Sequence, residues 1–491
     1  MSRRDSISNL PDEILGKILS LVPTKVAAST SVLSKRWRNL LGLVDNLCLD
    51  DSIVFSCPDE EEAAKIRFLD LVDKICALLS NSPMAMIKKL SLCHVPVTPC
   101  RKDIQAFVEP CVNRLIWTAM DCGLLELHLH GDPIHCGFFL DRAFLTSNTL
   151  VKLTISGDYY LEVDRVFFPA LKSLSLFCVM FDCFNHAKFL DGCPVLEELF
   201  ITEADQWYPP CSSAYVFNES VKRLVVLIDL PDSNQEHHYL MQIDAPSLVY
   251  LDYSGYVFPE YSVCDLNLLV EARLSLKLWE STNDYDYSDT DDDVDDNDEV
   301  DFYLDFYDPV PKAAIFGDVT ALVASISNIT TLHLSPDTLE AFQFCCKFMP
   351  VFDNLLNLSI ESHKEKGWQI MPLLLKSCPN LHTLVFKGLL HKVTNRCGDA
   401  CACIPRKQRK IVNEEEELCC LWTCQVKILK ISEYGGSFQE LDQMRHFLGK
   451  LECLETVKVG VGADNNDNIT VLRANLLALP RLSSECNIEF I

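Results

Sequence analysis

The stretch that decides the fold is Cys193-Pro194-Val195-Leu196-Glu197-Glu198-Leu199-Phe200-Ile201, which recurs with few changes as Cys378-Pro379-Asn380-Leu381-His382-Thr383-Leu384-Val385-Phe386. Each copy ends in a short strand pattern, in which two apolar residues flank a variable one. The chain carries thirteen copies of this three-residue pattern, and Leu47-Cys48-Leu49 is a degenerate earlier one. The copies begin at residues 90, 127, 153, 174, 199, 224, 251, 274, 332, 358, 384, 429 and 457.

The spacing of the copies indicates a repeat protein. Most neighbouring copies begin 21 to 27 residues apart, close to the roughly 20–29-residue period of leucine-rich repeats. Each repeat then supplies one strand whose apolar residues point inward, and stacked repeats share a continuous core. Apolar residues at helical spacing lie between strands, over 68–79 and 441–451. We therefore predict the α/β class: a leucine-rich-repeat solenoid with a curved parallel sheet and helices on its convex side.

Composition narrows the class of protein. The chain has 491 residues, 48% of them hydrophobic, a net charge of -27 and 24 cysteines. Neither a secretory signal nor an apolar run of membrane-spanning length is present, so we expect no membrane association and a cytoplasmic or nuclear, reducing location. The negative charge argues against nonspecific nucleic-acid binding, which needs clustered lysine and arginine.

The first forty residues differ from the body in charge and pattern. Residues 1–42 have a net charge of +4, because seven basic residues outnumber three acidic ones. Pro11 suits the first position of a helix, and apolar residues at 14, 15, 18 and 19 form a stripe along it. Pro23 ends that helix, a second short one follows from Thr24, and a third begins near Thr30. So small a helical unit either caps the next domain or presents its apolar stripes to an acidic partner.

The same segment resembles the F-box domain of plant proteins. The resemblance rests on residues 5–15, on Ile18-Leu19-Ser20-Leu21, on Pro23-Thr24-Lys25 and on residues 30–38. It implies a domain over residues 1–48 that binds a Skp-type adaptor and, through it, a cullin. The adaptor-binding and core positions that it implies are Leu10, Pro11, Ile14, Leu15, Ile18, Leu19, Val32, Leu33 and Trp37.

The two 193 and 378 phrases resemble the repeats of plant F-box/leucine-rich-repeat proteins, which places the solenoid at 49–420. From residue 421 to 491 the chain resembles the FBD region of the same family. The carrying segments are Cys424–Ile431, Tyr434-Gly435-Gly436, Met444–Leu448, Cys453-Leu454-Glu455 and Leu479–Cys486. We expect this FBD-like region to cap the solenoid, with the apolar terminus Ile488–Ile491 forming a last strand.

Two insertions interrupt the period. Residues 281–308 hold thirteen Asp or Glu and no Lys or Arg, so we expect a solvated, disordered loop, since the register of a calcium-binding EF-hand loop is missing.

The second insertion, at 391–424, contains His391 and six cysteines: Cys397, Cys401, Cys403, Cys419, Cys420 and Cys424. Zinc is one reading, but the paired C-x2-C motifs of common zinc sites are missing. Residues 397–404 also resemble a recurrent segment of the plant family for which no metal is implied. The sequence therefore favours reduced, partly buried thiols without metal or other cofactor.

No sequence motif for catalysis is present, including phosphate-binding glycine loops, nucleophile elbows and H-E-x-x-H. Together with the resemblance, this predicts a non-catalytic subunit that holds a protein substrate near a ubiquitin-transferring enzyme for degradation. A scaffold that binds the adaptor without delivering substrate, and a receptor completed by a small ligand, remain alternatives. The substrate-binding residues cannot be named from the sequence.

Overall fold

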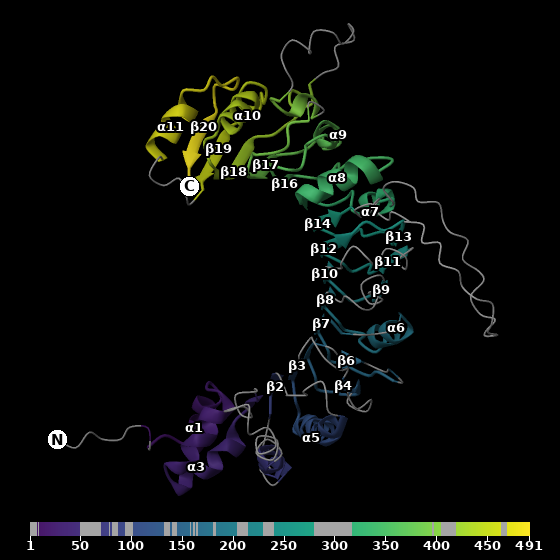
Figure 1. Ribbon diagram of the computed structural model, residues 1–491, viewed down its shortest axis with the longest axis vertical. Helices are drawn as coiled ribbons and strands as arrows, with labels where there is room; N and C mark the ends of the chain where they lie inside the picture. Colours follow the sequence, from purple (N-terminus) through teal and green to yellow (C-terminus); the bar gives the residue numbers. More distant parts are fainter. Residues whose placement is uncertain are drawn as a thin grey trace, which may run out of the picture.

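The computed structural model describes residues 7, 9–49, 70–77, 79–80, 87–93, 102–131, 138–139, 145–157, 159–160, 163, 165–179, 183–203, 215–228, 240–278, 317–394, 397–403, 419–462 and 469–491. These residues form an open arc (Figure 1), with a small helical unit at one end and the C-terminal helices at the other. The predicted acidic insertion at 281–308 lies outside the described residues.

One parallel sheet of fifteen strands lines the inner side of the arc. Every predicted repeat strand is present, including the degenerate copy at Leu47 and the predicted last strand, so the predicted fold class is confirmed. The strands are β1 (Asn46–Leu49), β2 (Lys89–Cys93), β3 (Glu126–His130), β5 (Lys152–Ser156), β7 (Ser173–Phe177), β8 (Glu198–Glu203), β10 (Arg223–Ile228), β12 (Tyr250–Tyr256), β14 (Glu271–Lys277), β15 (Thr331–Leu334), β16 (Asn357–Glu361), β17 (Thr383–Lys387), β18 (Ile428–Tyr434), β19 (Thr456–Val461) and β20 (Asn487–Phe490).

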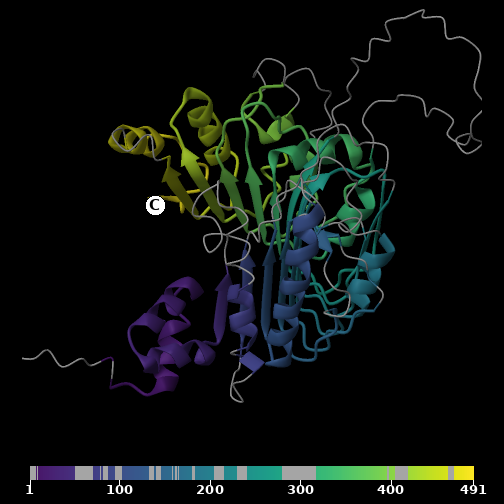
Figure 2. The same ribbon diagram turned by 60° about the horizontal axis from the view of Figure 1, so that its bottom comes forward.

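The register of the sheet stacks equivalent repeat positions in rows. Leu224 pairs with Leu199 on one side and with Leu251 on the other, and Val226 continues the alternation. These apolar residues are buried, whereas the residues between them point to the inner, concave face. Figure 2 shows the strands running side by side in one direction. β14 pairs directly with β15, although 53 residues separate the two strands in the sequence.

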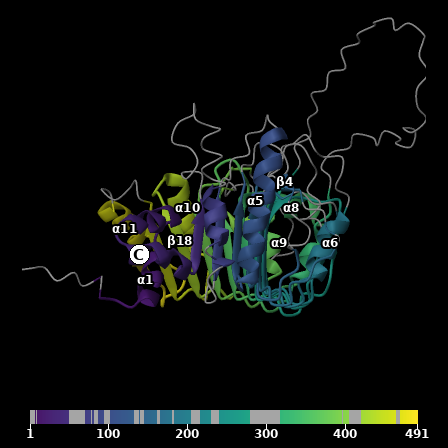
Figure 3. The ribbon, with the colours of Figure 1, turned by 90° about the horizontal axis from the view of Figure 1, so that it is seen from below.

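The convex side carries helices in only part of the arc, which Figure 3 shows from its end. Those described there are α5 (Lys102–Asp121), α6 (Cys183–Asp191), α7 (Thr320–Ser325), α8 (Pro336–Cys345), α9 (Met371–Lys376), α10 (Phe438–Leu448) and α11 (Ile469–Leu477). Residues 70–77 and 79–80 are also helical. Short strands take the place of helices at β4 (Phe138–Phe139), β6 (Tyr159–Tyr160), β9 (Tyr215–Phe217), β11 (Leu240–Asp244) and β13 (Glu260–Val263).

The predicted helices lie on the convex side, but the middle repeats carry short strands there instead of helices. Strands β9, β11 and β13 pair into a second parallel sheet there. Their sequences are three to five residues long and alternate buried with exposed positions, as in Leu240–Asp244. A segment of that length satisfies its backbone better by pairing with the equivalent segment of the next repeat than by forming one isolated helical turn.

The N-terminal unit contains α1 (Asp12–Leu19), α2 (Thr24–Ser29), η1 (Thr30–Val32), α3 (Lys35–Leu40) and η2 (Leu41–Leu43). The predicted third helix is thus split in two. Gly16 of α1 lies so close to η2 that an added Cβ would sit 2.7 Å from the Leu43 carbonyl oxygen. The boundary predicted at residue 48 falls inside β1, so the helices and the sheet share one core.

The C-terminal end closes the sheet as expected. β20 pairs in parallel with β19, and Ile488 is buried. Helix α10 begins with a capping box between Ser437 and Glu440. Among the described residues, no helix combines the length and apolarity needed to cross a membrane.

Candidate binding surfaces

Helix α1 divides the predicted apolar stripe into two sets. Leu15 and Leu19 are 0% and 4% exposed and belong to the core, while Ile14 and Ile18 are 41% and 43% exposed. Neighbouring residues on a helix differ by about 100° in direction, so a stripe built from adjacent pairs faces two ways. Of the predicted adaptor-binding and core positions, Leu15 and Leu19 are therefore core residues, and Ile14 and Ile18 remain accessible to a partner.

The other predicted positions lie at or near the surface. Pro11 is exposed, Val32 and Leu33 are 83% and 66% exposed, and Leu10 and Trp37 are half-buried against the core. Exposed apolar side chains concentrate between residues 14 and 33, where six occur; we term them the helical apolar surface. Its members are Ile14, Ile18, Leu21, Val26, Val32 and Leu33. Leu21 and Val26 were missed, because a helical-stripe argument does not include residues beyond the helix end.

Basic side chains accompany the helical apolar surface. Lys17, Lys25 and Lys35 are exposed. Arg36 forms an ion pair with Asp12 at 2.6 Å and donates to the Leu10 carbonyl oxygen, which fixes the start of α1 against α3. Apolar side chains with a basic surround suit a partner that carries apolar pockets and acidic charge.

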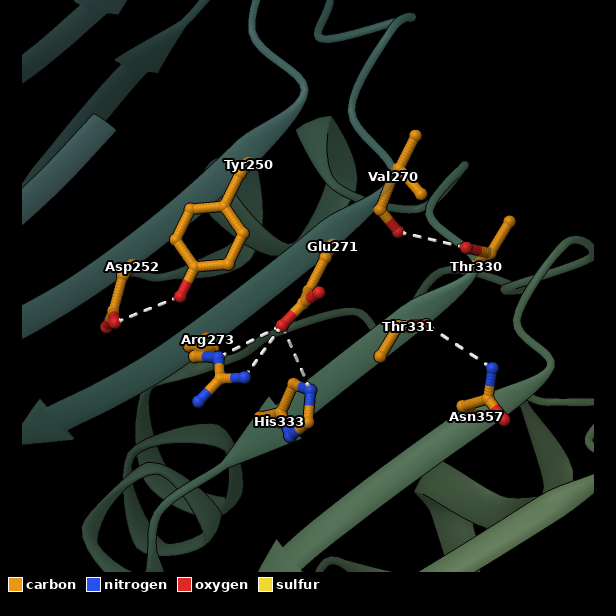
Figure 4. Close-up of polar contacts among 9 residues, drawn as sticks. All are labelled: Tyr250, Asp252, Val270, Glu271, Arg273, Thr330, Thr331, His333 and Asn357. Atoms are coloured by element: carbon orange, nitrogen blue, oxygen red, sulfur yellow. Dashed lines mark hydrogen bonds and ion pairs between the residues drawn. The ribbon is translucent and has the colours of Figure 1, made fainter. Parts of the chain in front are cut away.

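A second surface lies on the concave face where β8, β10, β12, β14 and β15 adjoin. We term it the concave cluster, shown in part in Figure 4. The register places Tyr250 beside Glu271, Asp252 beside Arg273, and Arg273 beside His333. Its members are Phe200, Arg223, Tyr250, Asp252, Glu271, Arg273 and His333.

Glu271 and Tyr250 organise the concave cluster. Glu271 Oε1 accepts from Arg273 Nε at 3.0 Å and lies 3.3 Å from His333 Nε2. The Tyr250 hydroxyl donates to Asp252 Oδ2 at 3.3 Å, and the Arg223 guanidinium lies 3.8 Å from the centre of the Tyr250 ring. These contacts hold flexible side chains in defined positions, which lowers the entropy cost of binding.

Protonation of the concave cluster is set by its surroundings. Burial and the nearby Arg273 lower the pKa of His333 despite the opposing effect of Glu271. The imidazole is therefore neutral at pH 7, and its contact with Glu271 is a hydrogen bond rather than an ion pair. Burial and Asp252 raise the pKa of the Tyr250 hydroxyl, which keeps it a donor. The surface thus offers both charge signs beside aromatic rings, a composition typical of protein-binding hot spots.

The cysteine-rich insertion separates into two groups. Cys397, Cys401 and Cys403 gather around His391, whereas Cys419 contacts Lys450 instead. His391 Nε2 lies 3.0 Å from Cys401 Sγ, a thiol–imidazole pair of the kind found in cysteine hydrolases. Both residues are at most 3% exposed, so no substrate can reach them. This pair gives no support to an enzyme.

Comparison with known proteins identifies relatives along the whole chain. Residues 7–49 match the F-box domain family, and residues 112–268 match the family described as FBD-associated F-box protein At5g56370, LRR repeats. F-box/LRR-repeat protein At1g48400 of Arabidopsis thaliana is 64% identical over all of this chain and 99% of its own length. Putative F-box protein At1g64540 and F-box protein At4g27050 of the same plant are each 48% identical, over at least 99% of both chains.

Proposed function

Because the chain belongs to the plant F-box/leucine-rich-repeat protein family, we propose that it is the substrate-recognition subunit of a Skp-cullin-F-box ubiquitin ligase. The helical apolar surface carries this proposal. Val32 and Leu33 are large apolar residues at 83% and 66% exposure, although other apolar residues of the unit are buried in the core that it shares with the sheet. Such side chains favour a permanent protein partner. A Skp-type adaptor, which would bridge to cullin, fits their position in the F-box.

We assign capture of a protein substrate to the concave cluster. The curvature of the sheet turns this face inward, and the cluster lies near the middle of the arc (Figure 1). Arg223 and Tyr250 are rigidly stacked and half-buried, so they offer contact area that costs little further ordering on binding. A substrate held there in the cytoplasm or nucleus would be kept at high effective concentration near a recruited ubiquitin-transferring enzyme.

In this proposal the chain makes and breaks no bond of its own. Its contribution is geometric, because it positions a lysine of the substrate near an enzyme carried by the cullin. Two alternatives keep the adaptor contact: a scaffold that delivers no substrate, and a receptor whose groove is completed by a small ligand. The mixed charge and aromatic rings of the concave cluster favour a protein substrate over a scaffold with an inert face.

The test compares three full-length proteins in plant cells. They are the wild type, Val32→Asp/Leu33→Asp, and Arg223→Glu/Arg273→Glu, with proteasome activity blocked. Captured proteins and their ubiquitin-modified lysines are measured by mass spectrometry. We expect the first variant to capture substrates but lose the adaptor and their ubiquitination, and the second to retain the adaptor but lose the substrates.

Leu268→Asp is the matched control, since Leu268 is 59% exposed but lies outside both surfaces. It should behave as the wild type. If proteins bind the wild type, but their ubiquitination is the same in the wild type and in both variants, the scaffold would replace the receptor proposal. Capture that depends on an added small-molecule extract would support the ligand-completed receptor.

A further inference from the structure

We propose that His391, Cys397, Cys401 and Cys403 form a structural zinc site in the insertion between β17 and β18. One ligand atom from each residue, an imidazole nitrogen and three sulfurs, lies within 4.8 Å of all the others. These four residues lie within a span of thirteen positions, in the spacing H-x5-C-x3-C-x-C. The sequence favoured thiols without metal because C-x2-C pairs are missing, but the fold brings the ligands together without them.

The separations suit a single tetrahedral ion. With Zn–S of about 2.3 Å and Zn–N of about 2.0 Å, the edges of a tetrahedron are roughly 3.5–3.8 Å. Because no two of the four ligand atoms are more than 4.8 Å apart, only small movements would bring them to these distances. The distance from His391 Nε2 to Cys401 Sγ, 3.0 Å, is already within about 0.5 Å of such an edge. The ligand set contains no carboxylate, which disfavours magnesium and calcium, and three thiolates with one imidazole suit zinc.

The surroundings orient the imidazole for metal binding. His391 Nδ1 donates to the Leu389 carbonyl oxygen at 3.0 Å, which leaves the lone pair of Nε2 directed toward the sulfurs. The Trp368 ring stacks on the imidazole with centres 4.0 Å apart and planes 12° apart. A hydrogen bond on the second nitrogen and a packed ring plane are the usual supports of a metal-binding histidine.

The sulfurs also have supporting donors. The backbone N–H of Cys403 donates to Cys401 Sγ at 3.2 Å, and the Thr394 hydroxyl lies 3.3 Å from Cys397 Sγ. Donors of this kind stabilise the negative charge of zinc-bound thiolates. Cys397 and Cys401 are 0% and 1% exposed, so a bound ion would be shielded from solvent on that side.

The site lies between β17 and β18, at the level of the chain where neighbouring repeats carry a helix. Helix α9 precedes β17 and helix α10 follows β18, but between β17 and β18 the described residues contain only the short turn η7 (Gly398–Ala400). That turn contacts α9 closely: an added Cβ on Gly398, whose φ is +61°, would sit 2.4 Å from Pro372 Cγ. A folded loop of this size lacks an apolar core of its own, and a metal ion supplies the missing cross-links.

Helix α10 holds the other side of the site. Gln443 is 1% exposed; its Oε1 accepts from the Ala402 N–H at 2.9 Å and its Nε2 donates to the Ala400 carbonyl oxygen at 3.2 Å. His446 Nε2 lies 2.8 Å from the Asp399 carbonyl oxygen. Residues 391–403 therefore join the repeats to α10 of the C-terminal region, and loss of the metal should weaken the packing of α10.

The experiment measures metal in the full-length protein, purified with its adaptor if needed and without metal-affinity resin. Elemental mass spectrometry should find about one zinc per chain. Replacing zinc with cobalt should give the visible absorption of tetrahedral, thiolate-bound Co²⁺. Cys403→Ser, which changes the half-exposed ligand, should reduce retained zinc at least about tenfold after dialysis against a chelator.

Cys424→Ser is the matched control, because Cys424 is a buried thiol of the same insertion whose Sγ donates to the Cys420 carbonyl oxygen instead. It should retain zinc at the wild-type level. A well-folded wild-type protein with less than about a tenth of an equivalent of any metal, and no tetrahedral cobalt spectrum, would overturn the proposal. So would zinc that is lost equally from Cys403→Ser and Cys424→Ser, because the metal would then not depend on these ligands.

Discussion

Truncation of the two most exposed predicted adaptor contacts gives a quantitative test of the helical apolar surface. Burying a whole valine or leucine side chain contributes about 1.5–3 kcal/mol. Val32 and Leu33 are 83% and 66% exposed, so a docked adaptor can cover most of each. Removing the atoms beyond Cβ with Val32→Ala/Leu33→Ala should then cost about 2–3 kcal/mol of binding free energy. That loss corresponds to a dissociation constant about 30- to 150-fold weaker.

The assay is calorimetric titration of full-length protein with purified Skp-type adaptor. The melting temperature of the double variant should stay at the wild-type value, since neither side chain is buried in the free chain. Leu268→Ala, a truncation of similar exposure on the repeats, should leave the dissociation constant within about twofold. Leu15→Ala should instead lower the stability of the helical unit by about 2–5 kcal/mol, because it opens a cavity. An unchanged dissociation constant for the double variant would refute the assignment of this surface.

Three further predictions concern stability. Thr338→Val should speed amide exchange at Leu276 about 30-fold, because the buried Thr338 hydroxyl accepts that N–H at 2.8 Å and its loss costs about 2 kcal/mol. Thr330→Val is the control, since the Thr330 hydroxyl makes a solvent-exposed bond to Val270, and it should leave exchange at Leu276 unchanged. Burial lowers the pKa of His186 to about 4, so stability is fully present above about pH 6.5 and falls by about 2 kcal/mol by pH 5, a loss that urea unfolding of His186→Leu should not show. Truncation after Gly460 removes β20 from β19 and should give an aggregating protein by light scattering; a soluble monomer would contradict the capping role.

The sheet could be predicted from the sequence because each repeat carries the apolar pattern of its own strand. The leucine-centred pattern marks an alternation in which Leu224 and Val226 point into the core while Val225 points to the concave face. The same alternation predicts the strands of the fifteen-stranded sheet. The convex side could not be predicted in the same way. Tyr215–Phe217 is only three residues long, and its role depends on pairing with Leu240–Asp244 of the next repeat. Short apolar segments do not indicate by themselves whether they form a turn of helix or a strand.

The binding surfaces required contacts that single-residue patterns do not contain. The resemblance identified α1, but only packing against the rest of the unit separates buried Leu15 from exposed Ile14. The concave cluster depends on strand register: aligning the residue before each copy sets Tyr250 beside Arg273, whereas the sheet pairs Tyr250 with Glu271. The sequence drew attention to His391 and six cysteines, but their spacing matches no common zinc motif, so it could not single out the four residues that the fold brings together.

The joint between the helical unit and the sheet bears on how the helical apolar surface and the concave cluster would work together in the proposed receptor. The Ser20 hydroxyl accepts the Asp45 N–H at 3.0 Å, and the Thr24 hydroxyl accepts the Cys48 N–H at 2.7 Å, so the C-cap of α1 is hydrogen-bonded to the residue before β1, and the start of α2 to β1 itself. Both hydroxyls are buried, where water does not compete for these bonds. A flexible linker at this position would spread a substrate over a large volume and lower its effective concentration near the ubiquitin-transferring enzyme. Since β1 belongs to the same sheet as the strands of the concave cluster, in the proposed receptor the joint would instead fix the direction in which a captured substrate is presented relative to the adaptor.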